Sequence, residues 1–382
     1  MSQQSSVAIV RCAEYSHEAV LGAVRRGLGL LGGAARFARA GERILLKPNM
    51  LAPDPAERCV TTHPSVLRAV GQAFQEAGAR VAFGDSPAVR KQEATARKTG
   101  LLEAAQAQAI AMADFSAART VSNPDGVQNR QFRLAGAALD ADGIVNLPKL
   151  KTHGLTRMTG AVKNVFGCVP GLLKAEFHVR LPDPDLFGRM LVDLAAMVRP
   201  RLHIMDAVMA MEGNGPRGGT PKRLGLLLLS ADPVALDATA SRIIGLAPEY
   251  APTTRFGEAT GLGAAQAERI EIVGEPLASV RADGFDIVNR PPKPLPRRGL
   301  MRLLRDRVVP RPVIVEARCT HCGECVTVCP TDPKSVDWRD GDRSRPPKHH
   351  YRSCIRCYCC QEICPESAIV IKTPWLGRLL PR

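Results

Sequence analysis

The sequence predicts an α/β fold followed by a smaller, cysteine-rich α+β domain. In residues 1–285, short aliphatic and β-branched runs alternate with longer amphipathic stretches, as a mostly parallel sheet with helices on both faces requires. Nine of the twelve cysteines lie between Cys319 and Cys364. Between these two parts, four prolines within residues 291–296 interrupt any helix or central strand.

The aliphatic runs predict the strands of the sheet, and the periodic stretches predict its helices. The predicted strands are Val7–Val10, Arg43–Leu46, Arg80–Phe83, Gly143–Val145, Leu202–Met205, Leu224–Leu229 and Ile270–Val273. Residues 63–77 place their apolar side chains on one helical face, and Gly78 is a usual C-terminal cap. Further helices are predicted at Asp185–Val198 and Val234–Ile244.

The change in composition places a domain boundary near residue 285. We expect an α/β domain over 1–285, a basic Pro/Arg-rich linker over 286–312, the cysteine-rich domain over 313–373 and a basic tail over 374–382. Within the linker, Gly299 to Val309 predicts a short basic helix with three leucines on one side. Docking of this helix on a neighbouring part of the protein is the simpler interpretation, and contact with a membrane surface stays open.

The chain is basic, with 52 Lys and Arg against 37 Asp and Glu and a formal charge of +15. Such charge suits an anionic partner, but aromatic residues make up only 4% and do not interleave with the basic ones, so we predict no nucleic-acid binding. No run approaches the roughly 18 apolar residues of a membrane span. The first ten residues also do not have the pattern of a secretory signal. We therefore expect a cytoplasmic protein without a transmembrane segment.

Two cysteine runs share the spacing C-x-x-C-x-x-C-x-x-x-C-P, which is typical of ferredoxins with two [4Fe-4S] clusters. In such domains the fourth cysteine of each run ligates the other cluster. One predicted cluster therefore takes Cys319, Cys322, Cys325 and Cys364, and the other takes Cys354, Cys357, Cys360 and Cys329. Cys359 is left over, because ligation through it would break the spacing on both sides. Structural zinc is the alternative, but zinc has no use for a third closely spaced cysteine.

Polar residues follow several predicted strands of the α/β domain. The carboxyl ends of the strands border the ligand crevice in open α/β sheets. Any one of these segments could be an ordinary polar turn, but as a set they predict a site. The set comprises Lys47-Pro48-Asn49, Asp85-Ser86-Pro87, Asn146-Leu147-Pro148-Lys149, Asp206 and Asp232.

The segment 146–171 carries the most specific signal of this set. In an extended chain, Lys149, Lys151 and His153 project from one face and form a cationic patch. Such a patch could bind a carboxylate or phosphate, or place a lysine as acid, base or Schiff-base nucleophile. A solvated basic strand edge is the alternative interpretation.

The same segment predicts a short helix that presents two more polar side chains. Thr159 would cap this helix, which would run to Phe166 and end at Gly167. Lys163 and Asn164 would be presented on it. With the cationic patch, they complete our candidate catalytic residues, which are Lys149, Lys151, His153, Lys163 and Asn164.

Other conspicuous residues give weaker signals. Cys168 is predicted to be a small buried hydrophobe rather than a redox thiol. Gly213 to Thr220 has the outline of a phosphate loop, yet Gly219 stands where that motif needs lysine, so we predict no nucleotide site. Finally, His63, His178 and Asp237 have no partner that the sequence identifies.

As a whole, the chain resembles the family called domain of unknown function 362, in which an α/β domain is often fused to a bacterial-type ferredoxin domain. The ferredoxin resemblance covers Pro312 to Thr373 and fills all eight ligand positions. The resemblance to the domain of unknown function 362 family implies no catalytic residue. It spans Ala8 to Gly274 and rests on Lys47-Pro48-Asn49, Thr62-His63-Pro64, Gly84-Asp85-Ser86-Pro87, Asn146 to Gly171, Asp206, Glu212-Gly213-Asn214-Gly215-Pro216 and Asp232 to Asp237.

Three functions are consistent with these observations. The first is an iron-sulfur oxidoreductase, whose two clusters pass single electrons between a redox partner protein and a small anionic substrate in the α/β domain. The second is a ferredoxin-like carrier or docking module that catalyses nothing. In the third, the clusters are purely structural and hold together a segment too short to build a core.

Overall fold

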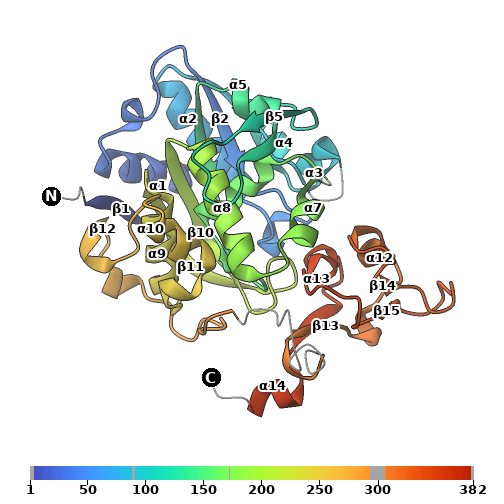
Figure 1. The fold of residues 1–382 in the computed structure, drawn as a ribbon. Coiled ribbons are helices and arrows are strands. Elements are labelled where there is room, and N and C mark those ends of the chain that lie inside the picture. The colour runs from blue at the N-terminus through green and yellow to red at the C-terminus, as the bar shows by residue number, and fades with distance from the viewer. Residues whose placement is uncertain (1–3, 88–90, 172, 293–305, 380–382) are drawn as a thin grey trace.

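The computed structural model describes residues 4–87, 91–171, 173–292 and 306–379, and its larger part is a mixed sheet between two layers of helices (Figure 1). Along its main path the sheet runs in the order β12-β1-β11-β10-β7-β2-β3-β4, and β8 and β9 extend it beside β10. The strands are β1 (Ser5–Arg11), β2 (Arg43–Pro48), β3 (Arg80–Phe83), β4 (Ala111–Met112), β7 (Gly143–Leu147), β8 (Lys149–His153), β9 (Arg157–Thr159), β10 (Leu202–Glu212), β11 (Thr220–Ser230) and β12 (Ile270–Gly274).

Most neighbouring strands are parallel. The pairs from β10 through β7, β2 and β3 to β4 are parallel, as is β1 with β12, whereas β11 runs antiparallel to both β1 and β10. The strand β8 follows β7 after Pro148 and pairs with β10 in the same direction. The carboxyl ends of β2, β3, β7 and β8 therefore all face the same side of the domain.

Alternate residues of the strands pack on opposite faces of the sheet, as the two-residue period of a strand dictates. In β2, Ile44 and Leu46 belong to one apolar core and Leu45 to the other. The first core is covered by α1 (His17–Leu30), α2 (Pro64–Glu76) and α4 (Leu101–Gln106), and the second by α6 (Ala161–Asn164), α8 (Pro184–Val198) and α9 (Pro233–Ile243).

The remaining elements of this part are short. They comprise α3 (Gln92–Lys98), α5 (Gly136–Asp140), α7 (Leu173–Arg180), α10 (Pro252–Ala259), the 3₁₀ turn η3 (Val165–Cys168) and a hairpin of β5 (Ala118–Ser122) with β6 (Gln131–Ala135). Cys168 is fully buried in the apolar core, which agrees with its predicted role as a small hydrophobe.

The cysteine-rich domain lies beside the α/β domain, at the lower right of Figure 1. Two short helices, α12 (Glu324–Val328) and α13 (Cys359–Ile363), pack against each other between two small antiparallel sheets. These sheets pair β13 (Arg311–Ile314) with β16 (Ile369–Lys372), and β14 (Val336–Asp337) with β15 (Lys348–His349). One further helix, α14 (Trp375–Leu379), follows.

The predicted helices over 63–77, 185–198 and 234–244 form within one or two residues of their predicted ends. The strands β10 and β11 are longer than predicted, so Asp206 lies inside a strand rather than after one. No helix of the described residues is long and apolar enough to cross a membrane. The predicted helix at 299–309 lies mostly outside the described residues, although 306–308 are helical. The division near residue 285 stays a prediction.

Candidate functional site

Buried ion pairs stand at the carboxyl ends of the parallel strands. Lys47, at the end of β2, donates to the Asp85 carboxylate at 2.9 Å, and both side chains are almost completely buried. The other Asp85 oxygen accepts from the backbone N–H of Met50 at 2.7 Å. A side chain at Gly167 would overlap Asp85, because an added Cβ would lie 1.7 Å from Asp85 Oδ1. This pair therefore fixes the 47–50 loop against η3.

A second buried pair holds the first residue of the predicted cationic patch. Lys149 Nζ lies 2.8 Å from Asp206 Oδ2 and donates to the Tyr15 hydroxyl at 2.9 Å. The Tyr15 ring stacks on His63, with centroids 3.6 Å apart, and the His63 N–H donates to Asp206. Lys149 therefore supports the fold behind the site.

A chain of side-chain amides connects the next lysine to α6. Lys151 donates to Asn49 Oδ1 at 2.8 Å and to the Val60 carbonyl, and burial lowers its pKa to about 7. Asn49 then donates to Asn164, which donates to Asn146 at 2.7 Å. Because these residues are buried, the alternative of a solvated strand edge does not describe this segment.

His153 connects the α/β domain to the cysteine-rich domain. Its Nδ1 accepts from the backbone N–H groups of Leu155 and Thr156, so the ring proton lies on Nε2, 2.9 Å from Glu362 Oε1 on α13. Burial lowers the pKa of His153 to about 4, which keeps the ring neutral. Burial alone would raise the pKa of Glu362, but His153 and Lys163 hold it below its ordinary value.

The helix α6 begins differently from our prediction. Thr159 does not cap it, because its hydroxyl donates to the carbonyls of Lys149 and Lys151 instead. The backbone N–H groups of Ala161 and Val162 donate to Asp237 on α9, at 2.6 and 3.1 Å. Asp237 is thus the partner that sequence alone does not identify. The helix proper ends at Asn164, and the chain continues through Gly167 as a 3₁₀ turn.

Lys163 and Asn164 line a cavity of about 100 Å³ between the two domains, which we call the lysine cavity. Its walls come from the 49–51 loop, residues 85–86, α6 with η3, α7 and the helices α12 and α13 of the cysteine-rich domain. Besides Lys163, a second lysine, Lys174 of α7, lines it. The cavity also contacts Cys359 and Glu362 of α13.

The two cavity lysines differ in their partners. Lys174 donates to the Ser86 carbonyl at 2.8 Å, whereas Lys163 makes no hydrogen bond or ion pair with any described residue. Burial lowers the pKa of both, that of Lys174 to about 7. His178, also in the wall, is 5% exposed, and its Nδ1 has no hydrogen-bond partner among the described residues. This cavity therefore combines two lysines with the Asp85 and Glu362 carboxylates, and Lys163 and His178 Nδ1 are unpaired among the described residues.

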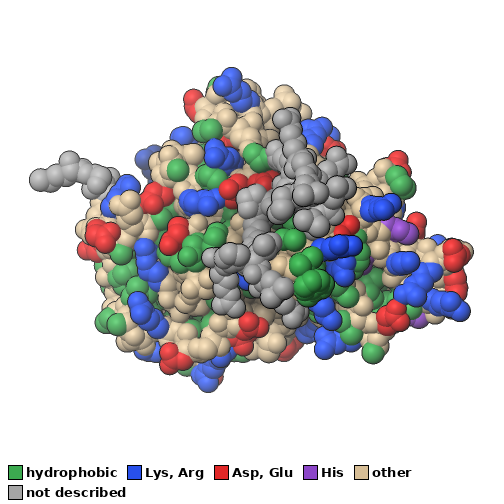
Figure 2. All heavy atoms as spheres, turned by 60° about the horizontal axis from the view of Figure 1, so that its bottom comes forward, with side chains coloured by type: hydrophobic (Ala, Val, Ile, Leu, Met, Phe, Trp, Pro, Cys, Tyr) green, Lys and Arg blue, Asp and Glu red, His purple; other side chains and the backbone are tan. Residues whose placement is uncertain are grey.

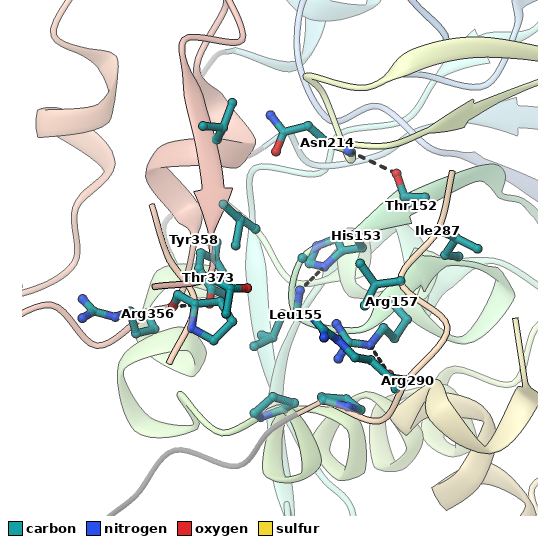
Figure 3. Close-up of a pocket in the computed structure, with 18 of the residues that line it drawn as sticks. Thr152, His153, Leu155, Arg157, Asn214, Ile287, Arg290, Arg356, Tyr358 and Thr373 are labelled. Carbon is teal, nitrogen blue, oxygen red and sulfur yellow. Dashed lines mark hydrogen bonds between the residues drawn. The ribbon is translucent and has the colours of Figure 1, made fainter. Parts of the chain in front are cut away.

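A larger cavity of about 350 Å³ lies on the other side of the His153–Glu362 pair, between His153 and Arg157 of one domain and Tyr358 and Arg356 of the other (Figure 3). Arg157 donates to the Arg290 carbonyl and Arg356 pairs with Asp306, both within 3 Å, and Arg290 also lines this cavity. We favour the lysine cavity as the site for an anion because residues of α12 and α13 that adjoin the cysteine pockets line it.

The cysteine-rich domain contains two small pockets, each lined by four cysteines. One is lined by Cys319, Cys322, Cys325 and Cys364, and the other by Cys329, Cys354, Cys357 and Cys360. These are the two crossed sets that the spacing predicts. No three His, Cys, Asp or Glu side chains of the described ranges are close enough to hold a single metal ion, which needs a tighter group than a four-iron cluster.

Both cysteine loops share one backbone conformation. His321 and Gly323 in the first loop, and Arg356 and Tyr358 in the second, have left-handed φ angles between 56° and 75°. Gly323 adopts this conformation without strain, whereas Tyr358 carries a side chain there. Backbone N–H groups of Ser335 and Ala368 donate to Cys329 and Cys364 sulfurs at 3.3 and 3.2 Å. Such bonds favour electron-rich sulfur and suit iron-sulfur ligands.

The loop from Gly213 to Thr220 is a docking surface for the cysteine-rich domain, not a phosphate loop. Gln361 of α13 donates to the carbonyls of Asn214 and Gly215, and Asn214 donates to the Ile369 carbonyl at 3.0 Å. Arg217 pairs with Asp54 at 2.7 Å and donates to the Ile363 carbonyl. Arg217 is only 3% exposed, so it joins the loop, Asp54 and α13 in a buried contact.

We expect Arg217→Ala to loosen α13 from the α/β domain. The change leaves Asp54 buried without its cation and the Ile363 carbonyl without its donor, and both losses are costly inside a protein. Hydrogen-exchange mass spectrometry should show faster exchange in the peptide that contains 359–364. Arg58→Ala is the control, because Arg58 is exposed and makes a single 3.3 Å bond to Ser367. Equal exchange in both variants would contradict this role of Arg217.

Comparison with known proteins gives the family of both domains. The model of the domain of unknown function DUF362 matches residues 44–242, and that of a 4Fe-4S dicluster domain matches residues 311–365. The chain belongs to the DUF362 family. The DUF362 region contains the buried lysines and the whole of α6, and the C-terminal domain is of the 4Fe-4S ferredoxin type, which favours iron-sulfur clusters over zinc.

Two curated proteins resemble this DUF362 protein. A thylakoid-associated protein of Synechocystis is 42% identical over 265 residues, which are 69% of this chain and 82% of that protein. One component of the ion-translocating oxidoreductase complex of Buchnera aphidicola is 32% identical over 63 residues, which are 15% of this chain and 13% of that component. The second match thus concerns a short segment only.

Solved structures resemble the DUF362 protein weakly. The lactate racemase apoprotein of Thermoanaerobacterium thermosaccharolyticum matches with a TM-score of 0.37 and 10% identity, over 61% of this chain and 55% of that one. A protein from Thermotoga maritima matches with a TM-score of 0.36 and 12% identity, over 57% and 56% of the two chains. These values carry no conclusion about the activity of this chain.

Only two of the five candidate catalytic residues predicted from the sequence line the lysine cavity. Lys163 and Asn164 line the cavity, His153 reaches it through Glu362, and Lys149 and Lys151 lie behind it. The sequence analysis missed Lys174 and assigned His178 no role, because α7 has no distinctive motif and approaches the cavity only in the folded chain. The signal that could have found them is their place directly after the Asn146–Gly171 segment.

Proposed function

We propose that this protein holds two [4Fe-4S] clusters in its C-terminal domain and passes electrons singly between a redox partner and an anionic ligand in the lysine cavity. The first cluster would be held by Cys319, Cys322, Cys325 and Cys364, and the second by Cys329, Cys354, Cys357 and Cys360. When bound, these clusters supply one-electron oxidation and reduction.

One observation carries this proposal. Val328, Cys359 and Ile363 line the lysine cavity, and the next residue of each, Cys329, Cys360 or Cys364, lines a cysteine pocket. Residues that are neighbours in the chain therefore line the cavity on one side and the two cysteine pockets on the other. A carrier that only docks on other proteins needs no such cavity beside its clusters, which favours the oxidoreductase over the carrier.

The lysine cavity supplies the means to hold an anion. Lys163 has no partner in the described residues, and Lys174 stands in the same wall with its ammonium group on the Ser86 carbonyl. Two ammonium groups in a mostly buried site attract a carboxylate or phosphate more strongly than they would in water. Glu362 also lines the cavity, where its carboxylate lies 2.9 Å from the neutral His153 ring and interacts with Lys163.

The proposed redox partner would approach the exposed side of the first cluster. Cys322 is the exposed cysteine of the proposed ligands, and a Cβ added at the neighbouring Gly323 would meet the Trp338 ring, over which the Arg343 guanidinium lies at 5.8 Å. Arg343, Arg345 and Lys348 are exposed nearby, and Figure 2 shows Lys and Arg side chains gathered on this lobe. An acidic partner protein suits this surface, because opposite charges steer association.

Lys163→Ala should weaken anion binding and leave both clusters in place. The variant removes one unpaired ammonium group, and we expect the Kd for sulfate or oxalate, measured by calorimetry, to rise about tenfold or more. Lys98→Ala, a change of an exposed lysine on α3, is the matched control. Unchanged anion binding, or loss of iron from the Lys163 variant, would count against the proposed site.

Anion binding should weaken as the pH rises through about 7. Burial lowers the pKa of Lys174 to about 7, with Asp85 acting against this shift and Lys47 and Lys163 contributing to it. Above this pH the ammonium group loses its proton and its attraction for an anion, so the sulfate Kd should rise by up to about tenfold per pH unit. In Lys174→Ala the affinity should be lower at pH 6 and the rise much smaller. A Kd that stays constant from pH 6 to 9 would exclude this role.

A further inference from the structure

Cys359 lines the lysine cavity, and its thiol donates a hydrogen bond to Cys357 of the second cysteine pocket. Cys359 is the first residue of α13, and its neighbours Tyr358 and Cys360 line the second cysteine pocket, which Cys359 itself does not. Cys359 lines the lysine cavity together with Lys163 and Glu362. The corresponding residue of the first cysteine loop is Glu324, so the second loop departs from the first by placing a thiol toward the cavity.

The same cavity contains polar groups that lack partners. His178 is 5% exposed and lines the cavity, and its Nδ1 has no hydrogen-bond partner in the described part of the chain. Lys163 likewise makes no hydrogen bond or ion pair with described residues. A buried polar group without a partner is costly, and a ligand that supplies the partner relieves this cost. The thiol therefore stands near a lysine and a histidine that an anionic ligand would partner, in a wall that also contains the Glu362 carboxylate.

We propose that Cys359 is a catalytic thiol that forms a mixed disulfide with a small disulfide bearing carboxylates. This inference rests on the proposed function, which supplies the electrons. A thiol exchanges with a disulfide through such an intermediate, and two one-electron clusters supply the two electrons that one S–S bond requires. The cationic lysines would hold the carboxylates of the disulfide.

The ligand disulfide would be reduced in two steps. In the first, the Cys359 sulfur attacks one sulfur of the ligand, the S–S bond of the ligand breaks, and one thiol leaves with the proton that Cys359 gave up. In the second, two electrons from the reduced clusters and two protons break the mixed disulfide, which restores the Cys359 thiol and releases the second thiol. The sum is the two-electron reduction of one disulfide to two thiols.

The first step is tested on the anaerobically purified holoprotein with oxidised clusters, using dithiodiglycolate as a small dianionic disulfide. Intact-mass and peptide analysis should find one mercaptoacetate per chain, on Cys359, with iron retained. Cys359→Ser should stay unlabelled and keep its iron, and Lys163→Ala should be labelled about tenfold more slowly. The neutral bis(2-hydroxyethyl) disulfide should label the Lys163→Ala variant and the unsubstituted protein at similar rates.

Three results would overturn the proposal: a label on a proposed ligand cysteine, equal labelling of Cys359→Ser, or loss of iron from both Cys359→Ser and Cys359→Ala. The last result would make Cys359 a cluster ligand. Labelling needs no electrons from the clusters, so a failure of labelling can be distinguished from a failure of the proposed electron transfer.

The second step is tested on protein whose clusters have been reduced and from which the reductant has been removed. Adding dithiodiglycolate should abolish the reduced-cluster signal, and the Cys359→Ser variant should keep that signal.

Discussion

Cys360→Ser should lower the iron content from about eight to about four atoms per chain, whereas Cys359→Ser should leave about eight. The two residues are neighbours and equally buried, with 7% of each exposed, yet they face different spaces. Cys360 lines the second cysteine pocket with Cys329, Cys354 and Cys357, and Cys359 lines the lysine cavity. Loss of one thiolate from a four-cysteine site removes the anchor of one corner of the cluster.

Iron and acid-labile sulfide, counted in both purified variants, decide this prediction. Cys329→Ser gives a matched test of the crossed ligation, because Cys329 belongs to the first run in sequence and to the second pocket in space. The electron paramagnetic resonance spectrum of reduced Cys329→Ser should resemble that of Cys360→Ser and differ from that of Cys325→Ser. A Cys329 variant that behaves like the Cys325 variant would contradict the crossed assignment.

Asp206→Ala should destabilise the protein by about 3–5 kcal/mol, the usual cost of leaving a buried charge without its partner. The Asp206 carboxylate is fully buried and accepts from Lys149, the Tyr15 hydroxyl and the backbone N–H of His63. In the variant, the buried Lys149 ammonium group keeps only its hydrogen bond to the Tyr15 hydroxyl. The loop before α2 also loses its contact with β10.

Thermal unfolding followed by circular dichroism measures this effect. Glu93→Ala is the control, since the Glu93–Arg97 pair is more than 60% exposed on both sides and surface pairs contribute little to stability. We expect a markedly lower Tm for Asp206→Ala and almost none of that change for Glu93→Ala. Equal Tm values would show that the Lys149–Asp206 pair does not hold the site together.

The sequence predicted the fold well where local patterns determine it. Apolar runs located the strands, and the helix over 63–77 formed because its apolar residues repeat at the helical period and Gly78 follows. The cysteine spacing also predicted two groups that the structure collects into separate pockets. In these cases the residues that act together are close in the chain or set by a strict spacing.

The candidate site was less predictable because tertiary contacts reassign its polar groups. Lys149 and Lys151 looked like a cationic patch, but Asp206 and Asn49, which are distant in the chain, bury and pair them. Asp237, rather than the local Thr159, receives the first N–H groups of α6. Such pairings depend on strand order, which no local pattern encodes.

Cys359 illustrates the opposite case. Spacing alone excluded it from both cluster sets, but did not say what it does instead. The structure places it in the wall of a cavity that Lys163 and Lys174 also line. Cys359 reaches this wall because α13 docks on the 213–220 loop through Gln361 and Arg217.

The most direct test of the central claim is the electron paramagnetic resonance spectrum of the anaerobically purified protein before and after chemical reduction. We expect little signal before reduction, and after it the signal of two interacting [4Fe-4S]⁺ clusters in a protein with about eight iron atoms per chain. Zinc in place of iron, or clusters that stay unreduced, would contradict an electron-transfer role and leave a structural or binding protein.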